Sequence, residues 1–466
     1  MPSLTAKTLI LMCLPALMTG CAMQTYAPKP IVPAQSVAQL QQRTLESAEL
    51  RAYMLSQEYP ESSFPIKTWG MRELTLVAFY YHPQLDVARA QWQLAQAGKV
   101  SAGQKPNPGI SSGAEHHSKA NGVSPWTLSF SLGFPIETGD KRAIRMARAD
   151  SLSEAARIDI GQTAWLIRSR LRKLFDDYAA TTRQAHLLAR EVTLRNEIVL
   201  MLQHRLDAGM VSDIELTNVR LQLQKAQQAL AVEQGKLPGI KAAIADAIGL
   251  PAQAIESVQL DTATTALAAL PDAALQQTAL TNRLDIRAAL LRYDAAESRL
   301  KLEIAKQYPD ITLSPGYSFD QGDNRWSLGL STVLTLLNKN EGAIAEASAQ
   351  RELEAQQFNA LQSRVIGELD QSRTRYQAAL DEAAKADQLL NAQQQRAAKT
   401  ERQFEAGYAD RLEQAGSQLE TLGAEQGVLA ASIRAQQALS MLEDAAQRPL
   451  DDSPFPTAPE RKDVKE

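Results

Sequence analysis

The sequence predicts a mainly α-helical protein with a small β part, built from one structural unit that occurs twice. Long segments rich in Ala, Gln, Leu, Glu and Arg carry apolar residues at every seventh position, which is the repeat of coiled coils. Short segments between them alternate polar and apolar residues, as strands do. Both patterns recur about 200 residues later, which indicates an internal duplication. Each unit is expected to contain a helix, two strands and a long helical hairpin.

Residues 1–20 resemble the signal peptide of a bacterial lipoprotein. A basic residue precedes an apolar run that ends in Leu17-Met18-Thr19-Gly20-Cys21. Cys21 would then be the lipidated first residue of the mature protein, and Ala22 resembles the pattern that is sorted to the outer membrane. The alternative is an ordinary signal peptide with an incidental cysteine. Because Cys13 is removed in either case, no intrachain disulfide is expected.

Residues 21–71 are expected to form a lipidated, extended arm that lies along the body. Prolines near both ends of this segment disfavour a long helix: Pro28, Pro30, Pro33, Pro60 and Pro65. The first structural unit follows at residues 72–250. It begins with helical spacing over residues 72–103, which is interrupted at His82-Pro83.

Residues 127–136 alternate polar and apolar residues without an error. Ten residues of this pattern are typical of a transmembrane β-strand with lipid on one side and water on the other. The apolar face of this strand contains Leu128, Phe130, Leu132, Phe134 and Ile136. Residues 110–117 are the predicted partner, so the strand region covers about 109–136. The alternative is a hairpin of a soluble sheet that packs on the helices.

The first helical hairpin is expected at about 139–249. Apolar residues recur in steps of seven from Leu171 to Leu206, and a second series begins at Leu216. Gly209 lies between the two series, where a glycine can take the left-handed conformation that ends a helix. A continuous helix from residue 139 to the tip would be about 100 Å long. Such a hairpin is too long to be the core of a compact domain.

The second unit is expected at residues 282–448, because it repeats the landmarks of the first. At an offset of 198, Tyr178 recurs as Tyr376 and Gly209 recurs as Gly407. The period is too long for a solenoid repeat, so two copies of one large unit are the better description.

The strands of the second unit are expected at about 310–336, and its hairpin is expected at about 340–447. In the second unit, Leu328 and Leu330 correspond to lipid-facing residues of the first. The connection between the units, residues 251–281, is expected to be irregular. Residues 449–466 combine prolines with charges and are expected to form a disordered tail.

Four strands per chain are too few to enclose a useful pore, and hydrocarbon does not tolerate open sheet edges. Several chains would therefore share one barrel, and three chains would supply twelve strands. After removal of the signal peptide no stretch of 18 apolar residues remains, so no transmembrane helix is expected. The net charge of −4 gives no reason to expect nucleic acid as a partner.

The order of helix, two strands and long hairpin, duplicated behind a lipoprotein signal, resembles the TolC-like outer membrane efflux protein family. The resemblance covers roughly residues 72–447. It implies a homotrimer in the outer membrane of a Gram-negative bacterium, in which a 12-stranded transmembrane β-barrel is continuous with a periplasmic α-helical barrel. The implied partners are a periplasmic adaptor (membrane fusion) protein, an inner-membrane transporter of the RND type, and outer membrane lipid. The implied function is a passive exit duct of a tripartite pump for small toxic compounds or metal ions.

The resemblance also assigns residues to sites. The hairpin tips that would contact the adaptor contain Ala208, Gly209, Met210, Val211, Ala406, Gly407 and Tyr408. The acidic candidates for the narrow periplasmic entrance are Glu215, Glu413, Asp213 and Asp410. A ring of carboxylates at a constriction attracts cations, although ordinary solvated helix faces are an equal alternative. Residues 135–142 resemble the strand-to-helix junction in the branch that serves heavy-metal efflux.

No catalytic constellation, cofactor motif or cluster of metal ligands is visible in the sequence. His116 and His117 are expected to form a solvated pair near an external loop. Two alternative functions remain: the channel of a type I secretion system for a protein or peptide, and a lipid-anchored coiled-coil scaffold without a pore. Charging Phe130 and Leu330 would distinguish a lipid-facing strand from the face of a scaffold.

Overall fold

The computed structural model describes residues 24–119, 122–262, 267 and 274–450. The chain divides into two compact units, residues 1–43 and residues 44–466. The predicted signal peptide, the lipidation candidate Cys21 and residues 451–466 of the predicted tail lie outside the described residues.

The predicted extended arm over residues 21–71 contains two short helices. Helix α2 (Pro33–Gln41) lies in the first unit, and helix α3 (Ala48–Ser56) lies in the second. The prediction is therefore wrong for these segments. Pro33 lies in the first turn of α2, where its fixed φ suits a helix and no backbone hydrogen bond is lost. The Ser47 side chain caps α3 by accepting a hydrogen bond from the Leu50 amide at 3.1 Å.

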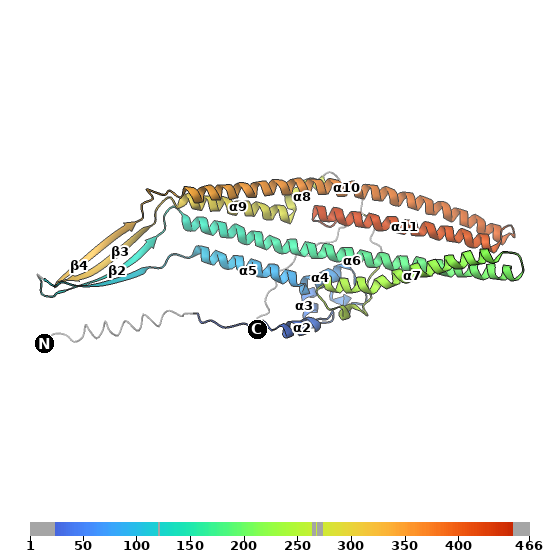
Figure 1. Ribbon diagram of the computed structural model, residues 1–466, viewed down its shortest axis with the longest axis horizontal. Coiled ribbons are helices and arrows are strands. Elements are labelled where there is room, and N and C mark those ends of the chain that lie inside the picture. Colours follow the sequence, from blue (N-terminus) through green and yellow to red (C-terminus); the bar gives the residue numbers. More distant parts are fainter. Residues whose placement is uncertain (1–23, 120–121, 263–266, 268–273, 451–466) are drawn as a thin grey trace. The chain divides into compact units, whose positions relative to one another are not determined.

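The first copy of the duplicated unit contains four helices and two strands, drawn from blue to green in Figure 1. The helical segment over residues 71–103 is interrupted at His82, as the sequence predicted. The elements are α4 (Met71–Tyr81), α5 (Pro83–Gly103), β1 (Gly109–His116), β2 (Trp126–Ile136), α6 (Lys141–Asp207) and α7 (Asp213–Ala247).

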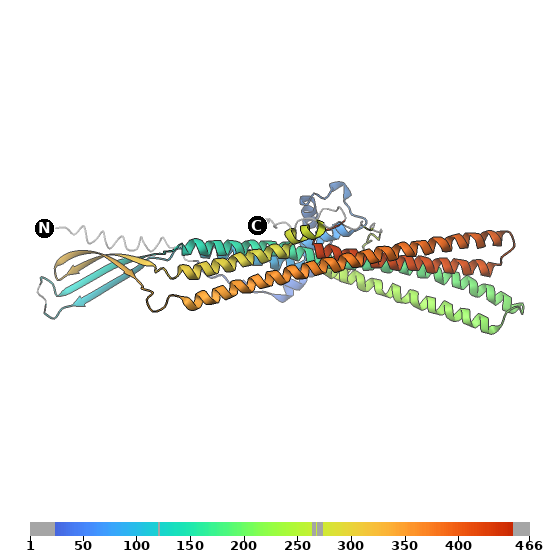
Figure 2. The ribbon, with the colours of Figure 1, turned by 90° about the horizontal axis from the view of Figure 1, so that it is seen from above.

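The second copy repeats this order, drawn from yellow to red in Figure 1. Its elements are α8 (Ala274–Asn282), α9 (Leu284–Ala305), β3 (Ile311–Asp320), β4 (Asp323–Thr332), α10 (Glu341–Glu405) and α11 (Arg411–Ala446). Within residues 44–450 the strands lie at one end of the helices and both hairpin tips lie at the other (Figures 1 and 2). The mainly α-helical fold with a small antiparallel sheet is therefore confirmed.

The four strands form one antiparallel sheet in the order β1-β2-β3-β4. The turn between β3 and β4 lies at Gln321-Gly322, where both residues have positive φ, 52° and 114°. Asp323 pairs with Asp320 and opens β4, because the glycine before it takes the conformation that other residues avoid.

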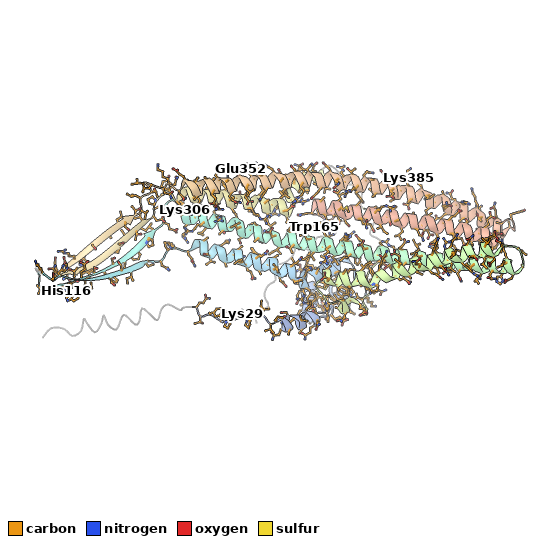
Figure 3. All side chains as sticks on the ribbon, in the orientation of Figure 1. Lys29, His116, Trp165, Lys306, Glu352 and Lys385 are labelled. Carbon is orange, nitrogen blue, oxygen red and sulfur yellow. The ribbon has the colours of Figure 1, made fainter. Side chains whose placement is uncertain are left out.

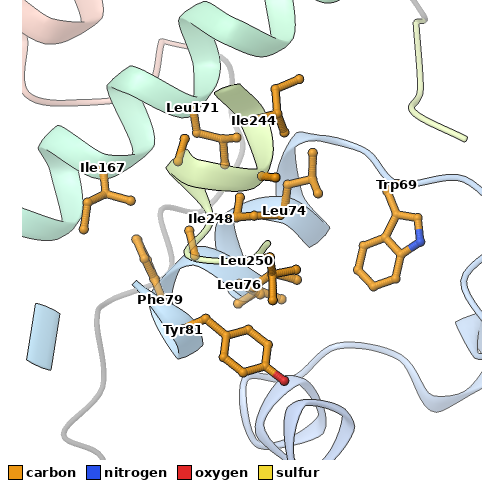
Figure 4. Close-up of a cluster of buried hydrophobic side chains, with 14 of the residues drawn as sticks. Trp69, Leu74, Leu76, Phe79, Tyr81, Ile167, Leu171, Ile244, Ile248 and Leu250 are labelled. Atoms are coloured by element: carbon orange, nitrogen blue, oxygen red, sulfur yellow. The ribbon is translucent and has the colours of Figure 1, made fainter. Parts of the chain in front are cut away.

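A hydrophobic core fixes the base of the first hairpin, where α4 packs against α6 and the end of α7 (Figure 4). The side chains in this core are almost completely buried and come from three separate parts of the chain: Leu74, Leu76, Phe79, Leu171, Ile244 and Ile248. The connection over residues 251–281, expected to be irregular, adds Ile255 to this core from a short 3-10 turn, Ala252–Ile255. Together with α8, this turn shows that the connection is partly helical.

A second core lies between α10 and α11. Tyr376 is its largest member, with none of its side chain exposed, and the same core contains Val365, Leu369, Leu439 and Leu442. Tyr376 occupies the heptad position that corresponds to Tyr178 in the first hairpin. In the part of the chain that the structure describes, no helix combines the length and the apolarity needed to cross a bilayer.

Helix α6 of the first copy packs on α11 of the second copy through buried charged groups. Arg168 lies 3.8 Å from Glu443, and both side chains are buried. The Asp176 carboxylate accepts hydrogen bonds from Arg172 Nε at 3.0 Å and from Ser440 Oγ at 3.5 Å. Burial raises the pKa of Asp176 above its usual range, and the Arg172 guanidinium only partly opposes this rise.

Asp176→Asn is expected to remove a pH dependence of unfolding. Because the native pKa of Asp176 is raised, the native state binds a proton that the unfolded state has lost. The stability of the wild type should therefore fall, relative to the variant, as the pH rises above about 4 towards the native pKa. Melting temperatures of both proteins between about pH 4 and 7 measure this difference. Asp387→Asn, at an exposed position on α10, is the control, and a difference independent of pH would contradict the expectation.

Candidate functional site

The sheet has one apolar face that is open to the surroundings. In an antiparallel sheet directly paired residues share a face, and Phe130 pairs with Tyr317 while Leu330 pairs with Leu313. Among the predicted lipid-facing residues, Leu328 and Leu330 are exposed by 72% and 70%. The other four lie on the same face, with Leu132 half-buried and three exposed: Leu128, Phe130 and Phe134.

The opposite face of the sheet consists of small hydroxyl side chains and glycines. Its central positions are Ser129, Ser131, Ser314, Gly316, Ser327 and Gly329. Hydroxyl groups bond to one another across the strands, as in the 2.7 Å contact between Ser111 Oγ and Ser131 Oγ. A sheet that is apolar on one face and hydrophilic on the other can separate lipid from water.

Charged and aromatic groups gather at the loop end of the sheet, where Figure 3 labels His116. The His116 ring packs edge-on against Trp126 at 4.9 Å, and His117 Nε2 lies 3.0 Å from Thr127 Oγ1. Thr127 in turn donates to Asp320 at 2.6 Å. Each histidine thus has a partner within the sheet. Among the described residues no group of three or more His, Cys, Asp or Glu side chains could hold a metal ion.

Both hairpin tips have the same backbone structure. Gly209 has a φ of 71°, and the amides of Gly209 and Met210 donate to the Leu206 and Arg205 carbonyl groups, each at 2.8 Å. Gly407 has a φ of 79°, and the amides of Gly407 and Tyr408 make the equivalent bonds at 3.0 and 2.8 Å. This glycine-dependent helix end closes both α6 and α10.

The four predicted acidic residues at the tips have different surroundings. The Glu215 carboxylate accepts a hydrogen bond from the Ser212 amide at 3.1 Å, and Ser212 Oγ accepts one from the Glu215 amide at 3.3 Å, which is a capping box. The Asp410 carboxylate caps α11 through the Glu413 amide at 2.8 Å. Asp213 and Glu413 lie in the first turns of α7 and α11 with exposed carboxylates.

Asp410 also connects the two hairpins. Its carboxylate lies 2.9 Å from Arg205 NH2 at the end of α6. Hydrogen bonds from the Glu413 amide and then from Arg205 lower the pKa of Asp410 below its usual range. Asp410 is thus expected to stay charged at a pH at which unperturbed aspartates begin to protonate.

Large apolar side chains protrude from the tips into the surroundings. Met210 is exposed by 74%, Ile214 by 73% and Tyr408 by 87%. The sequence analysis named Met210 and Tyr408 but missed Ile214, which follows the tip directly in the first turn of α7. These three exposed apolar side chains thus lie at the ends of the two long hairpins.

The family model described as outer membrane efflux protein matches residues 79–250 and 275–446. The chain belongs to the outer membrane efflux protein family. The two matched segments coincide with the two copies of the duplicated unit. As a member of this family, the protein is located in the outer membrane of a Gram-negative cell and extends into the periplasm.

This outer membrane efflux protein is similar to the cobalt-zinc-cadmium resistance protein CzcC of Cupriavidus metallidurans. The two are 25% identical over 270 residues, which cover 57% of this chain and 63% of CzcC. The matched region thus spans less than two thirds of the relative's length.

Two solved outer membrane proteins share the fold. VceC of Vibrio cholerae has a TM-score of 0.66 at 20% identity, with 82% of this chain and 97% of VceC covered. The MtrE outer membrane channel of Neisseria gonorrhoeae, in its open state, has a TM-score of 0.64 at 14% identity, with 82% and 89% covered.

In this outer membrane efflux protein the segment 135–142, which the sequence analysis compared with heavy-metal efflux systems, fixes the first strand-to-helix junction. Lys141 Nζ donates to Asp310 at 2.7 Å and to the Tyr308 carbonyl at 2.6 Å. Glu137 forms a two-point ion pair with Arg145 at 2.5 and 3.0 Å. These contacts hold the end of β2 and the start of α6 in one geometry.

Arg205→Ala is expected to loosen the contact between the two tips. An exposed ion pair contributes about 0.2–1 kcal/mol, so the amides around residues 404–412 should exchange with deuterium up to about fivefold faster. Arg402→Ala is the matched control, because the Arg402 side chain donates within its own helix, to the Ala398 carbonyl at 3.1 Å. Equal exchange in both variants would contradict a linking role for Arg205.

Proposed function

We propose that this protein is the outer membrane channel component of a tripartite efflux pump, a passive exit duct across the periplasm. The sheet carries the proposal, because its outer face is apolar and exposed while its inner face is hydroxyl-rich. A sheet of this kind is stable in hydrocarbon only when its two edges are paired. β1 and β4 are the edge strands of the sheet, and each pairs with one neighbouring strand of the chain. The outer edges of both strands are therefore available to pair with strands of other chains.

A homotrimer satisfies this requirement. Three copies supply twelve strands, since each chain has a four-stranded sheet, and β4 of one copy would pair with β1 of the next. Each chain also contributes the two hairpins α6/α7 and α10/α11, so the trimer would build a helical barrel of twelve helices below the strands. The duct is not expected to be an enzyme, in agreement with the channel structures that share its fold.

The remaining partners follow from the two ends of the molecule. The exposed Met210, Ile214 and Tyr408 are the proposed contacts for a periplasmic adaptor protein, which connects the duct to an inner-membrane transporter of the RND type. All four predicted acidic residues are exposed, but the carboxylates of Glu215 and Asp410 cap α7 and α11. Asp213 and Glu413 are therefore the better candidates for a carboxylate ring at the periplasmic entrance. Cys21 is the proposed site of lipidation.

Metal cations are the cargo that we favour among small toxic compounds. The supporting observation is the similarity to CzcC, whose name records resistance to cobalt, zinc and cadmium. Exposed carboxylates at the entrance would raise the local concentration of cations without binding them permanently.

Deletion of the gene tests the function. The deletion strain is expected to become more sensitive to cobalt, zinc or cadmium ions, and the wild-type gene should restore resistance. Unchanged sensitivity across a broad panel of metals and organic toxins would contradict an efflux role. If a secreted protein or peptide disappeared instead, the channel would belong to a type I secretion system.

A further inference from the structure

The second strand-to-helix junction exposes an apolar segment that the described part of the chain leaves uncovered. Residues 333–337 connect β4 to α10 and belong to no helix or strand. Val333, Leu334, Leu336 and Leu337 are exposed by two thirds or more, and nearby Tyr308 is exposed by 62%. A contiguous exposed apolar patch of this kind indicates a binding surface.

The polar groups of this junction bind the end of α9, while its leucines are exposed. Thr335 Oγ1 donates to the Gln307 carbonyl at 3.2 Å, and Gln307 Nε2 donates to the Lys339 carbonyl at 2.9 Å. Asn340 Nδ2 donates to the Glu303 carbonyl at 2.8 Å. The connection is therefore held to the end of α9 by its polar residues, so the exposure of the leucines is part of a fixed geometry.

The first junction, at the equivalent position, is polar. At an offset of 200, Leu337 corresponds to Glu137, and Ala345 corresponds to Arg145. The ion pair between Glu137 and Arg145 is thus absent from the second copy, where an exposed leucine replaces the acid. The duplicated fold therefore does not require a leucine at this position.

We propose that residues 333–337 bind glycerophospholipid in the inner leaflet of the outer membrane. The apolar spacing of β4, seen at Leu328 and Leu330, continues in the sequence at Leu334 and Leu336. Lys306, labelled beside the strands in Figure 3, and Lys339 lie at the same junction. The Lys339 ammonium has no ion-pair partner in the described part of the chain and can meet a lipid phosphate. Tyr308 adds an amphipathic ring typical of membrane interfaces.

This proposal rests on the proposed function, because it requires that the strands span the membrane. The test attaches a nitroxide to single cysteines and compares its accessibility to oxygen, which partitions into lipid, with its accessibility to a water-soluble nickel chelate. The full-length protein is placed in vesicles of phosphatidylethanolamine and phosphatidylglycerol. The variants are Leu337→Cys and Leu336→Cys in the segment, Leu330→Cys on β4, and Lys105→Cys, an exposed position between α5 and β1. Unsubstituted protein reports any labelling of Cys21.

The nitroxides at positions 336 and 337 are expected to be several-fold more accessible to oxygen than to the nickel chelate, as is the nitroxide at position 330. The nitroxide at position 105 is expected to be more accessible to the nickel chelate. A preference for nickel at positions 336 and 337 would overturn the proposal, because the segment would face water. Low accessibility to both reagents would also overturn it, because another copy of the chain would cover the segment. If position 330 itself favoured nickel, the strands would lie outside lipid and the proposed function would fail first.

Discussion

Phe130→Arg and Leu330→Arg are each expected to prevent insertion of the protein into the outer membrane. Both side chains lie on the apolar face of the sheet and are exposed, Phe130 on β2 and Leu330 on β4. An arginine on the lipid face near the middle of a membrane strand costs about 2–4 kcal/mol. Because a homotrimer would carry each substitution three times, the cost per assembly multiplies. Fractionation of membranes on density gradients measures the fraction of the protein that reaches the outer membrane.

Ser331→Arg is the matched control for this experiment, because Ser331 is the neighbour of Leu330 on the hydroxyl-rich face of the same strand. It is expected to insert normally, since that face would line a water-filled barrel. Normal insertion of all three variants would mean that neither face contacts lipid. The lipid-anchored scaffold without a pore would then be the better description.

Tyr376→Ala is expected to lower the free energy of unfolding by about 3–5 kcal/mol, the range for removing a buried aromatic ring. Tyr376 is completely buried in the core between α10 and α11 that also contains Leu369 and Leu439. Alanine would leave a cavity in the seam that holds the second hairpin together. Urea unfolding of the detergent-solubilised protein, followed by circular dichroism, measures the loss.

The internal duplication provides the control for this substitution. Tyr178 occupies the same seam position in the first hairpin, but its ring is only half-buried and lies 6.0 Å from the Lys241 ammonium. Tyr178→Ala is therefore expected to cost clearly less than Tyr376→Ala. Equal losses would show that burial in these seams does not control stability, and would contradict the packing described for α10 and α11.

The sequence predicted the elements whose patterns are long and periodic. The heptad series that starts at Leu171 predicted α6, because a helix of that length must bury one continuous seam. Gly209 and Gly407 marked both tips, since few residues other than glycine adopt a positive φ there. The strict alternation of residues 127–136 predicted β2 and its apolar face.

Local chemistry that depends on neighbouring elements was harder to predict. Glu215 was named as a candidate for the entrance ring, and its carboxylate also caps α7 together with Ser212. The Ser-x-x-Glu spacing was a signal that could have revealed this capping role. Asp410 was assigned in the same way, and its contact with Arg205 joins two hairpins about 200 residues apart in the chain. No sequence pattern encodes a contact of that kind.

The strand-to-helix junctions illustrate a third limit. The two junctions occupy equivalent places in the duplicated unit, yet the first has the ion pair between Glu137 and Arg145 where the second has Leu337 and Ala345. Two copies with the same fold can thus have different surroundings. The exposure of Leu337 depends on the hydrogen bonds by which Thr335 and Asn340 hold the connection to the end of α9, and no sequence pattern predicts these bonds.

The mass of the native, detergent-extracted mature protein tests the central proposal most directly. A trimeric duct predicts a species of three times the mass of the mature chain, with acyl chains on each copy if Cys21 is lipidated. The species should persist when the protein is diluted in detergent, because the shared barrel closes the edges of all three sheets. A monomer that stays in solution without detergent would contradict the shared barrel, and with it the proposed exit duct.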